Sequence, residues 1–488
     1  MRSTNFAISL AFASCSFTQD VPLALVQNNT FNATHGIYNS QTARSRIAEA
    51  NLSTGSSEAV LAALDFERSN WAGTSVRLDP FYTDLPANWT DAPAGSAIKI
   101  EQRTNTSLYT IAPTLAISRL VYTTKNLNGT TIPASAYVLW PWAPRRFDLA
   151  HNSGAAGLPL IAWAHGTSGW SGECGPSHVR SLWYQFMIFT AATQGYVVVA
   201  PDFAGLGLDH NSAGNLIPHQ YLSSEAHGND LLYAVQAAKQ AWPALGSQYV
   251  VMGHSQGGGA AWGAARNGSD VDELRKGYLG SIAGSPWTSF GTSLRFQQSV
   301  SGLNSIVARI ATGVASIFPS FSYSDWLTEK GVRAVELMQD LQGCQSVALE
   351  LLSTSDLVRE GWNQTWYVDA FDNLTTNIGK PVAGPLLVLQ GNADSSVNAT
   401  GTSAAVNTTC DVVPDAQIEY VEFEGVSHTP VMFAGQQVWL NWIADRFEGK
   451  EAPKGCQRRS YQPLLNIPSY QKDRNWFLEW NQYPYGVA

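Results

Sequence analysis

The chain has 488 residues, of which 44% are hydrophobic and 14% are charged, and its formal net charge is −9. This composition excludes an intrinsically disordered protein, because apolar side chains are numerous enough to bury a large core. The acidic balance and the lack of long Lys or Arg runs exclude nucleic acid as an expected partner. The length allows one large domain or two to three smaller ones.

The N-terminus has the pattern of a secretory signal peptide. Arg2 precedes an apolar run from Phe6 to Ala13, and small residues follow it. We expect a signal peptide over residues 1–18 and a polar N-terminal extension over 19–78. A lipoprotein signal ending at Cys15 is the less favoured alternative. No segment has the 18 or more apolar residues that a membrane span needs, so no membrane-spanning segment is expected.

Sequons are abundant along the chain. About four Asn-x-Ser/Thr triplets would arise by chance from this composition, and the excess predicts N-glycans and secretion. Compositional accident is the alternative interpretation. The eleven sequons begin at Asn28, Asn32, Asn51, Asn88, Asn105, Asn128, Asn267, Asn363, Asn373, Asn398 and Asn407.

Cysteine usage fits the same compartment. Once Cys15 is set aside with the signal peptide, four cysteines remain: Cys174, Cys344, Cys410 and Cys456. A secreted protein would pair them, and three connectivities are open. There is no CxxC motif and no Cys/His pair at ligand spacing, so no metal site is expected.

The predicted elements begin with a hairpin and continue as a strand–helix alternation. Residues 116–122 and 134–140 are strand-like and flank the turn Asn128-Gly129. From residue 158, short apolar strands alternate with helices, of which 224–240 is the clearest. This alternation predicts an α/β fold with a mostly parallel sheet and helices on both faces. The expected strands cover 159–164, 196–200, 249–252, 277–283, 385–389 and, as the last, 418–423.

Residues 287–380 break this alternation. They contain helical segments at 306–317 and 332–341 without a convincing strand, which predicts a helical cap or lid inserted between two core strands. Ordinary connecting helices are the alternative. The core is then expected in two parts, 79–286 and 381–450, followed by a C-terminal tail over 451–488.

The sequence Gly253-His254-Ser255-Gln256-Gly257 carries the sharpest chemical signal. It follows the apolar strand 249–252 and precedes a small-residue helix, which is the context of a nucleophile elbow. The tight turn leaves no room for side chains at Gly253 or Gly257. The N-terminus of the helix behind Ser255 places positive dipole where an oxyanion forms. A structural serine turn is the alternative.

A serine nucleophile needs a base and an acid, in the chain order Ser, acid, His. His428 is the only histidine C-terminal to Ser255, and it follows the strand 418–423. Asp394 follows the strand 385–389 and would accept the second ring N–H of His428. Glu422 and Glu424 are competing acids, but both are near a strand end, where solvation is expected.

An oxyanion hole needs two backbone N–H donors. We expect one from Gln256 and the other from the loop 164–169, with Thr167 as first candidate and Gly166 as second. His165 and His254 are interpreted as structural, and Asp202 as a loop organiser beside the site. The glycines after Asp202 are too weak a signal for a nucleotide loop, because no Walker pattern is present.

Several segments together resemble the fungal secretory lipase family, the Candida antarctica lipase A-like group of the α/β-hydrolase superfamily. The similarity extends from about residue 79 to 447. Outside it are the N-terminal extension and the tail after Gly455. The segments are the elbow itself and residues 79–82, 129–138, 159–169, 198–207, 219–222, 391–394 and 425–428.

The resemblance implies secretion, no cofactor, a helical lid over the acyl pocket, and activity on esters or triglycerides. It also implies the disulfide pairs Cys174–Cys344 and Cys410–Cys456. The lid, which lines the acyl pocket, is where this chain resembles the family least. Lipase and small-ester esterase therefore both stay open.

The expected function is hydrolysis of carboxylic esters through an acyl-enzyme, on an ester or lipid substrate. Acyl transfer, or peptide or thioester cleavage, by the same triad is the first alternative, and it includes action on a secondary metabolite. A catalytically inactive hydrolase fold that serves in binding is the second. It should have lost a triad member, whereas Ser255, Asp394 and His428 are all present.

Overall fold

The computed structural model of the chain describes residues 40–86, 89–147, 157–183, 185–211, 213–266, 276–296 and 300–470. The expected signal peptide lies outside these ranges. So do the sequons at Asn28, Asn32, Asn88 and Asn267.

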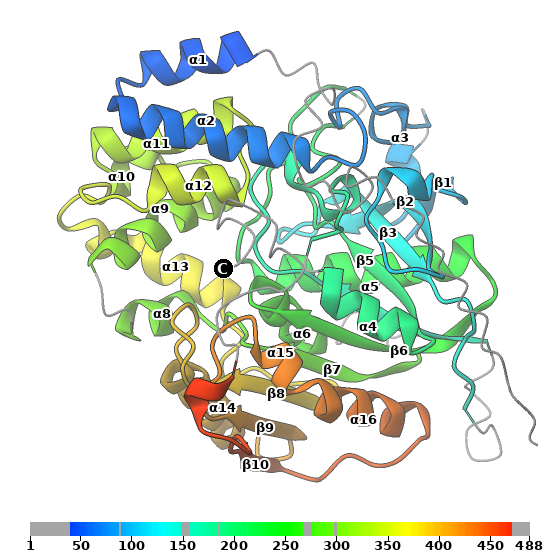
Figure 1. The fold of residues 1–488 in the computed structure, drawn as a ribbon. Helices are drawn as coiled ribbons and strands as arrows, with labels where there is room; N and C mark the ends of the chain where they lie inside the picture. Colours follow the sequence, from blue (N-terminus) through cyan, green and yellow to red (C-terminus); the bar gives the residue numbers. More distant parts are fainter. Residues whose placement is uncertain are drawn as a thin grey trace, which may run out of the picture.

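The described residues are organised around one large sheet (Figure 1). The strand order is β1-β2-β3-β5-β4-β6-β7-β8-β9-β10. The first three strands are antiparallel to their neighbours, and all pairs from β5 onward are parallel. The strands are β1 (Ala97–Glu101), β2 (Ala116–Lys125), β3 (Thr131–Trp140), β4 (Leu158–Ala164), β5 (Val197–Pro201), β6 (Leu245–His254), β7 (Tyr278–Gly284), β8 (Leu386–Gly391), β9 (Ile418–Phe423) and β10 (Cys456–Tyr461).

Helices cover both faces of the sheet, which explains why the central strands are apolar on both sides. β5 and β8, for example, are buried along their whole length. α5 (Ser224–Ala241) and α6 (Gln256–Arg266) pack on one face, and α4 (Gln185–Thr193) and α16 (Gln436–Phe447) on the other. The chain therefore has the mostly parallel sheet with helices on both faces that its strand–helix alternation predicted.

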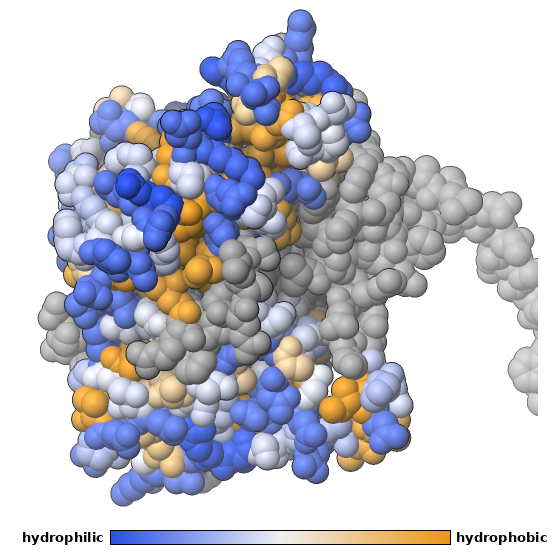
Figure 2. All heavy atoms as spheres, turned by 90° about the vertical axis from the view of Figure 1, so that its left-hand side faces the viewer, coloured by the Kyte–Doolittle hydropathy of each residue, from blue (hydrophilic) through white to orange (hydrophobic). Residues whose placement is uncertain are grey.

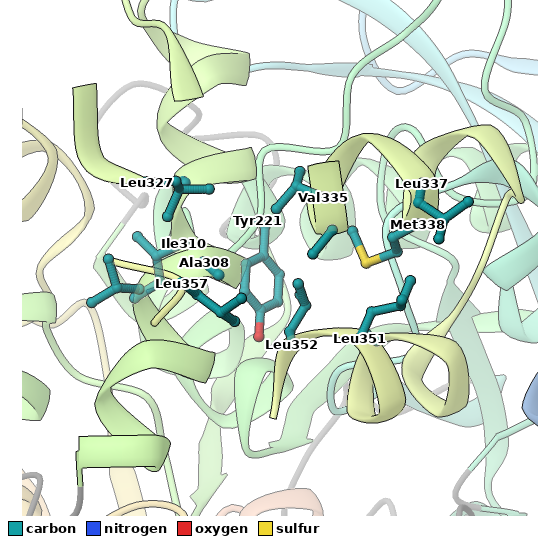
Figure 3. Packing of buried hydrophobic residues seen from close by; sticks show 14 of the residues in the cluster. Tyr221, Ala308, Ile310, Leu327, Val335, Leu337, Met338, Leu351, Leu352 and Leu357 are labelled. Atoms are coloured by element: carbon teal, nitrogen blue, oxygen red, sulfur yellow. The ribbon is translucent and has the colours of Figure 1, made fainter. Parts of the chain in front are cut away.

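A second, all-helical layer lies beside the sheet and forms the cap (Figure 1). Between β7 and β8 the chain forms α8 (Phe290–Phe296), α9 (Val300–Ile317), α10 (Tyr323–Trp326), α11 (Glu329–Asp340), α12 (Gln345–Leu352) and α13 (Trp366–Thr375). These helices share an apolar cluster in which Tyr221, from the core, is surrounded by cap side chains such as Leu327, Val335 and Leu352 (Figure 3).

The N-terminal extension is part of this cap. α1 (Ser40–Glu49) and α2 (Thr54–Ser69) lie over α11 and α12 (Figure 1). They contribute Ala43, Ile47, Val60 and Leu64 to the cap cluster. The sequence showed only weak periodicity here, because α2 buries the polar residues Glu67, Arg68 and Ser69 as well as apolar ones.

The remaining described elements are three helices and six 3₁₀ turns. They are the helices α3 (Pro80–Thr83), α14 (Ala399–Val412) and α15 (Val431–Ala434), and the 3₁₀ turns η2 (Trp89–Asp91), η3 (Thr106–Leu108), η4 (Gly172–Cys174), η5 (Pro176–His178), η6 (Trp362–Gln364) and η7 (Ile467–Ser469). No helix within the described ranges is long and apolar enough to cross a membrane.

One expectation about the sheet is wrong: β9 is not the last strand. β10 pairs parallel to β9 at the sheet edge, from Cys456↔Ile418 to Tyr461↔Phe423. Its side chains are mostly exposed, so its sequence lacks the apolar alternation that identifies a half-buried strand. β1 was missed for a related reason, since most of it is only partly buried.

Candidate active site

Ser255 sits at the turn between β6 and α6. Its backbone is left-handed, with φ of +59°, a conformation that side-chain-bearing residues adopt only when the surrounding structure enforces it. The N–H of Ser255 donates to Gly284 O over 2.9 Å. A Cβ on Gly253 would collide with the carbonyl of Gly257, and one on Gly257 with the carbonyl of Ala164. The turn is therefore the strained, glycine-dependent geometry of an elbow.

His428 and Asp394 meet at the same end of the sheet. The distance from His428 Nδ1 to Asp394 Oδ2 is 2.7 Å, and the Asp394 side chain is fully buried. Asp394 also accepts the N–H groups of Ser396 and Val397, each over 2.8 Å. Burial alone would raise the pKa of Asp394, but the adjacent His428 and these hydrogen bonds lower it overall. A charged carboxylate therefore fixes the ring of His428.

Ser255 and His428, the expected nucleophile and base, are not hydrogen-bonded to each other. Within the part of the chain that the structure describes, Ser255 Oγ makes no hydrogen bond to His428. Such contacts are often long in ligand-free sites and tighten when substrate binds. The loop that carries His428 is instead held by His254, whose Nε2–H donates to the backbone carbonyl of His428 over 3.0 Å. His254 is thus placed as a support, as expected from the sequence.

The elbow, which carries one expected oxyanion donor, packs closely against the end of β4 and the loop that carries the other, since a Cβ on Gly257 would lie 2.0 Å from Ala164 O and 2.6 Å from His165 O. Gln256 is the first residue of α6, and Thr167 lies in that loop. Among the described residues, neither backbone N–H donates to another group. The Thr167 hydroxyl lies 3.1 Å from the Tyr221 hydroxyl. Both N–H groups therefore stay available to an oxyanion, and no observation favours Gly166 over Thr167.

His165 and Asp202 hold the loops around the donors. His165 Nε2 lies 3.1 Å from Asp202 O, and Nδ1 lies 2.6 Å from Gly166 O. The buried Asp202 carboxylate accepts from Ser177 N over 2.7 Å and from Ser135 Oγ over 2.5 Å. Burial raises the pKa of Asp202 to about 6. These contacts fit a loop organiser.

Two disulfides are present, Cys174–Cys344 and Cys410–Cys456. These are the pairs that the family resemblance implied. The first joins the segment after the oxyanion loop to the start of α12, where Gly169 and Cys344 also form a β-bridge. The second joins α14 to β10. The oxyanion loop is thereby attached to the cap.

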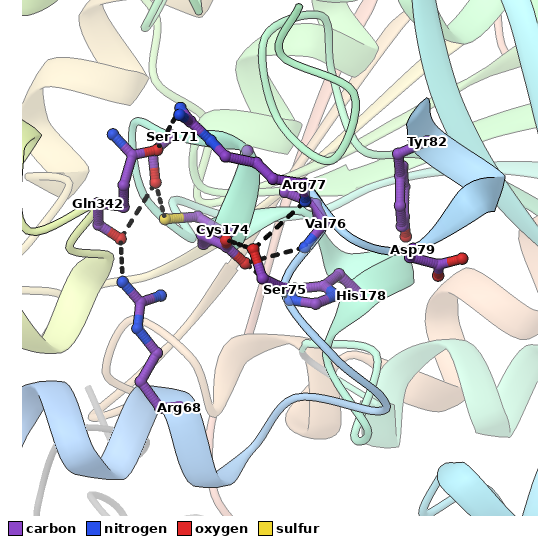
Figure 4. Close-up of polar contacts among 12 residues, drawn as sticks. Arg68, Ser75, Val76, Arg77, Asp79, Tyr82, Ser171, Cys174, His178 and Gln342 are labelled. Carbon is purple, nitrogen blue, oxygen red and sulfur yellow. Dashed lines mark hydrogen bonds and ion pairs between the residues drawn. The ribbon is translucent and has the colours of Figure 1, made fainter. Parts of the chain in front are cut away.

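Further polar contacts reinforce this attachment (Figure 4). Arg68 of α2 donates to the carbonyl of Leu341 over 2.7 Å, and Ser171 Oγ donates to the carbonyl of Gln342 over 3.2 Å. Ser75 and the N–H of Val76 contact the Glu173 carboxylate. These contacts join α2, the segment at Ser75 and Val76, and the residues just before α12 around the segment that follows the expected oxyanion loop.

Some residues around the site were not expected from the sequence. His219, His227 and Tyr221 contact the oxyanion donors, and Glu67 contacts the start of α12. The only sequence signal was the segment 219–222, noted for its family resemblance. In the described ranges, no group of three or more His, Cys, Asp or Glu is arranged to hold a metal ion.

Comparisons with known proteins agree with this architecture. The family model described as secretory lipase matches residues 181–455. Among curated proteins, lipase 5 of Candida albicans is 27% identical over 61% of this chain and 67% of its own length. A secreted triacylglycerol lipase of Malassezia globosa is 25% identical over 59% of this chain and 64% of its own length.

Solved structures share the fold at low sequence identity. Candida antarctica lipase A in its closed state has a TM-score of 0.62 at 18% identity, over 78% of this chain and 88% of that one. The rice cell wall degrading esterase LipA of Xanthomonas oryzae has a TM-score of 0.54 at 17% identity, over 72% and 97%.

Proposed function

The chain belongs to the secretory lipase family and is a carboxylic ester hydrolase, and we propose that Ser255, His428 and Asp394 are its catalytic triad. The observation that carries this proposal is the 2.7 Å contact between His428 Nδ1 and the buried Asp394 carboxylate. It lies at the sheet end where Ser255 occupies a left-handed turn. An imidazole oriented in this way has Nε2 free to act on a serine hydroxyl.

In the proposed reaction, His428 Nε2 takes the proton of Ser255 Oγ as the oxygen attacks the ester carbonyl carbon. The tetrahedral oxyanion is held by the N–H groups of Gln256 and of Thr167 or Gly166. The C–O bond to the alcohol then breaks, and His428 returns the proton to the leaving alcohol. Water then attacks the acyl-enzyme as the same ring takes its proton, the bond from the acyl carbon to Ser255 Oγ breaks, and His428 returns the proton to Ser255 as the acid leaves. Asp394 stays ionised and stabilises the imidazolium at each step.

We further propose that the protein is secreted and N-glycosylated, and that triacylglycerols are among its substrates. The sequon excess, the two disulfides and the family itself support secretion. The named activity of the Malassezia globosa relative supports the substrate class.

Residues 287–380 are proposed to act as a lid at a lipid–water interface. The helical layer between β7 and β8 supports this, as do the exposed Trp366 and Leu374 on α13. Figure 2, which looks onto the left-hand side of Figure 1, shows apolar patches among hydrophilic residues. An apolar surface of this kind is suited to contact with lipid.

The experiment that tests this function is labelling with a fluorophosphonate, with Ser255→Ala as control, together with hydrolysis of p-nitrophenyl esters from acetyl to palmitoyl. Labelling and hydrolysis by the wild type alone are expected. A wild type that neither labels nor hydrolyses any ester would overturn the proposal.

The lid has a separate test. Emulsified long-chain esters should react faster than the same esters in dilute solution, and equal rates would argue against a lid.

A further inference from the structure

The side chain of Gln256, whose backbone N–H is a proposed oxyanion donor, is held by two buried histidines. Its Nε2 lies 3.1 Å from Nε2 of His219 and 3.2 Å from Nε2 of His227. The two imidazole rings are stacked with centroids 4.9 Å apart. Gln256, His219 and His227 are all buried, so these contacts are made without competing water.

The tautomer of His219 is determined by the partner of its other ring nitrogen. His219 Nδ1 lies 3.0 Å from the carbonyl of Ala204, which can only accept, so this nitrogen carries the proton. Burial lowers the pKa of His219 well below its usual range and that of His227 to about 3, so both rings are neutral. His219 Nε2 is therefore an acceptor. The Gln256 amide can satisfy both rings only by donating one N–H to each.

The second oxyanion donor is held by the same segment of chain. Tyr221, two residues after His219, has its hydroxyl 3.1 Å from the Thr167 hydroxyl. Its ring lies inside the cap cluster and packs edge-on against Trp170, with centroids 5.1 Å apart (Figure 3). The backbone of this segment is tightly turned, since Tyr221 N–H donates to His219 O over 2.9 Å and Leu222 has φ of +60°.

We propose that His219, His227 and Tyr221 are positioning residues that set the separation and direction of the two oxyanion N–H groups. His219 and His227 act through the Gln256 side chain at the start of α6, and Tyr221 acts through Thr167. The proposal rests on ester hydrolysis at Ser255.

Loss of one of these positioning contacts should affect the chemical step more than substrate binding. Among the described residues, no hydrogen bond or ion pair joins any of the three to the triad, and an oxyanion hole contributes only when charge develops on the carbonyl oxygen. Loosening either donor should therefore lower kcat while leaving KM nearly unchanged. It should also weaken binding of a trifluoromethyl ketone, whose adduct with Ser255 carries an oxyanion, in parallel with kcat.

The experiment compares His227→Leu, His227→Gln, Tyr221→Phe and Tyr278→Phe in the full-length secreted protein. His227→Leu removes an acceptor, whereas Gln can place an oxygen near the position of Nε2. Tyr221→Phe and Tyr278→Phe each remove a tyrosine hydroxyl from a contact with another hydroxyl. The Tyr278 contact, 2.7 Å to Ser281 Oγ, belongs to β7 far from the elbow.

We expect kcat to fall about tenfold or more in His227→Leu and in Tyr221→Phe, with KM changed by less than about threefold. His227→Gln should restore most of the activity, and Tyr278→Phe should behave as the wild type. Because His227 acts through Gln256, His227→Leu should lower kcat no further in a Gln256→Leu background.

Two results would overturn the inference. The first is an unchanged kcat in both His227→Leu and Tyr221→Phe, while wild type still hydrolyses esters. The second is equal losses in Tyr221→Phe and Tyr278→Phe, which would indicate a general stability effect. A wild type that does not react with fluorophosphonate would instead reject the proposed function itself. If His227→Leu does not fold, the kcat of Tyr221→Phe compared with that of Tyr278→Phe still tests the positioning role.

Discussion

The backbone N–H of Cys344 donates to the carboxylate of Glu67 over 2.8 Å, although the two residues are 277 positions apart. Glu67 lies on α2, and Cys344 is the N-cap of α12. The other carboxylate oxygen accepts the N–H of Val347 over 2.9 Å. A residue of the N-terminal extension thus satisfies donors at the start of a cap helix and next to the disulfide that fixes the oxyanion loop.

This buried carboxylate should make stability depend on pH. Burial raises the pKa of Glu67 from 4.5 to about 7, so the folded state holds a proton that the unfolded state releases between these values. Stability is therefore expected to fall as pH rises through this window, by about 3 kcal/mol. The variant Glu67→Gln should have a shallower slope in urea unfolding than the wild type, and the part that remains comes from other buried carboxyls such as Asp202, whose pKa burial also raises. The exposed Glu58→Gln should keep the wild-type slope, and identical slopes in the two variants would contradict the prediction.

The disulfide Cys174–Cys344 should matter for activity as well as stability. Replacing both cysteines by serine is expected to lower the free energy of unfolding by about 3–5 kcal/mol, because the bond closes a long loop. It should also lower kcat, since the oxyanion loop loses its covalent attachment to α12. The matched control removes Cys410–Cys456, which should cost stability with a much smaller effect on kcat. Equal kcat losses in the two variants would speak against the attachment.

Asp394→Asn should lower kcat/KM by about 10³–10⁴-fold, because an amide presents the wrong hydrogen-bond pattern to His428 Nδ1–H. Its unfolding midpoint should change little, since an asparagine side chain has almost the same volume. Glu422→Gln and Glu424→Gln test the two competing acids in the same assay. Near-wild-type activity in Asp394→Asn, with a loss in either glutamate variant, would reassign the acid.

Gly257→Ala should abolish activity and lower stability by about 1–3 kcal/mol or more. The added Cβ would collide with the Ala164 carbonyl and push α6 away from the oxyanion loop. Gly55→Ala on α2 is the control, because an added Cβ there has no neighbour within 4 Å. That change should leave kcat unaltered and raise the thermal midpoint slightly. An active Gly257→Ala enzyme would show that the close approach at the elbow is dispensable.

The sequence alone was sufficient for the local chemistry of the site. The elbow around Ser255 depends on glycines at fixed offsets, which a linear pattern records directly. The acid and base follow strands 8 and 9, and parallel strands bring their carboxyl ends to one edge, so chain order predicted that Asp394 and His428 would meet. The central strands were found because burial on both faces makes them continuous apolar runs.

Tertiary structure alone decided what supports that site. β10 pairs at the sheet edge through backbone hydrogen bonds, and its polar sequence does not predict this pairing. The contacts of Glu67 with α12 and of His219 and His227 with Gln256 join residues far apart in the chain. No local periodicity encodes such pairs, since a buried polar side chain is stabilised only by the partner that folding brings to it.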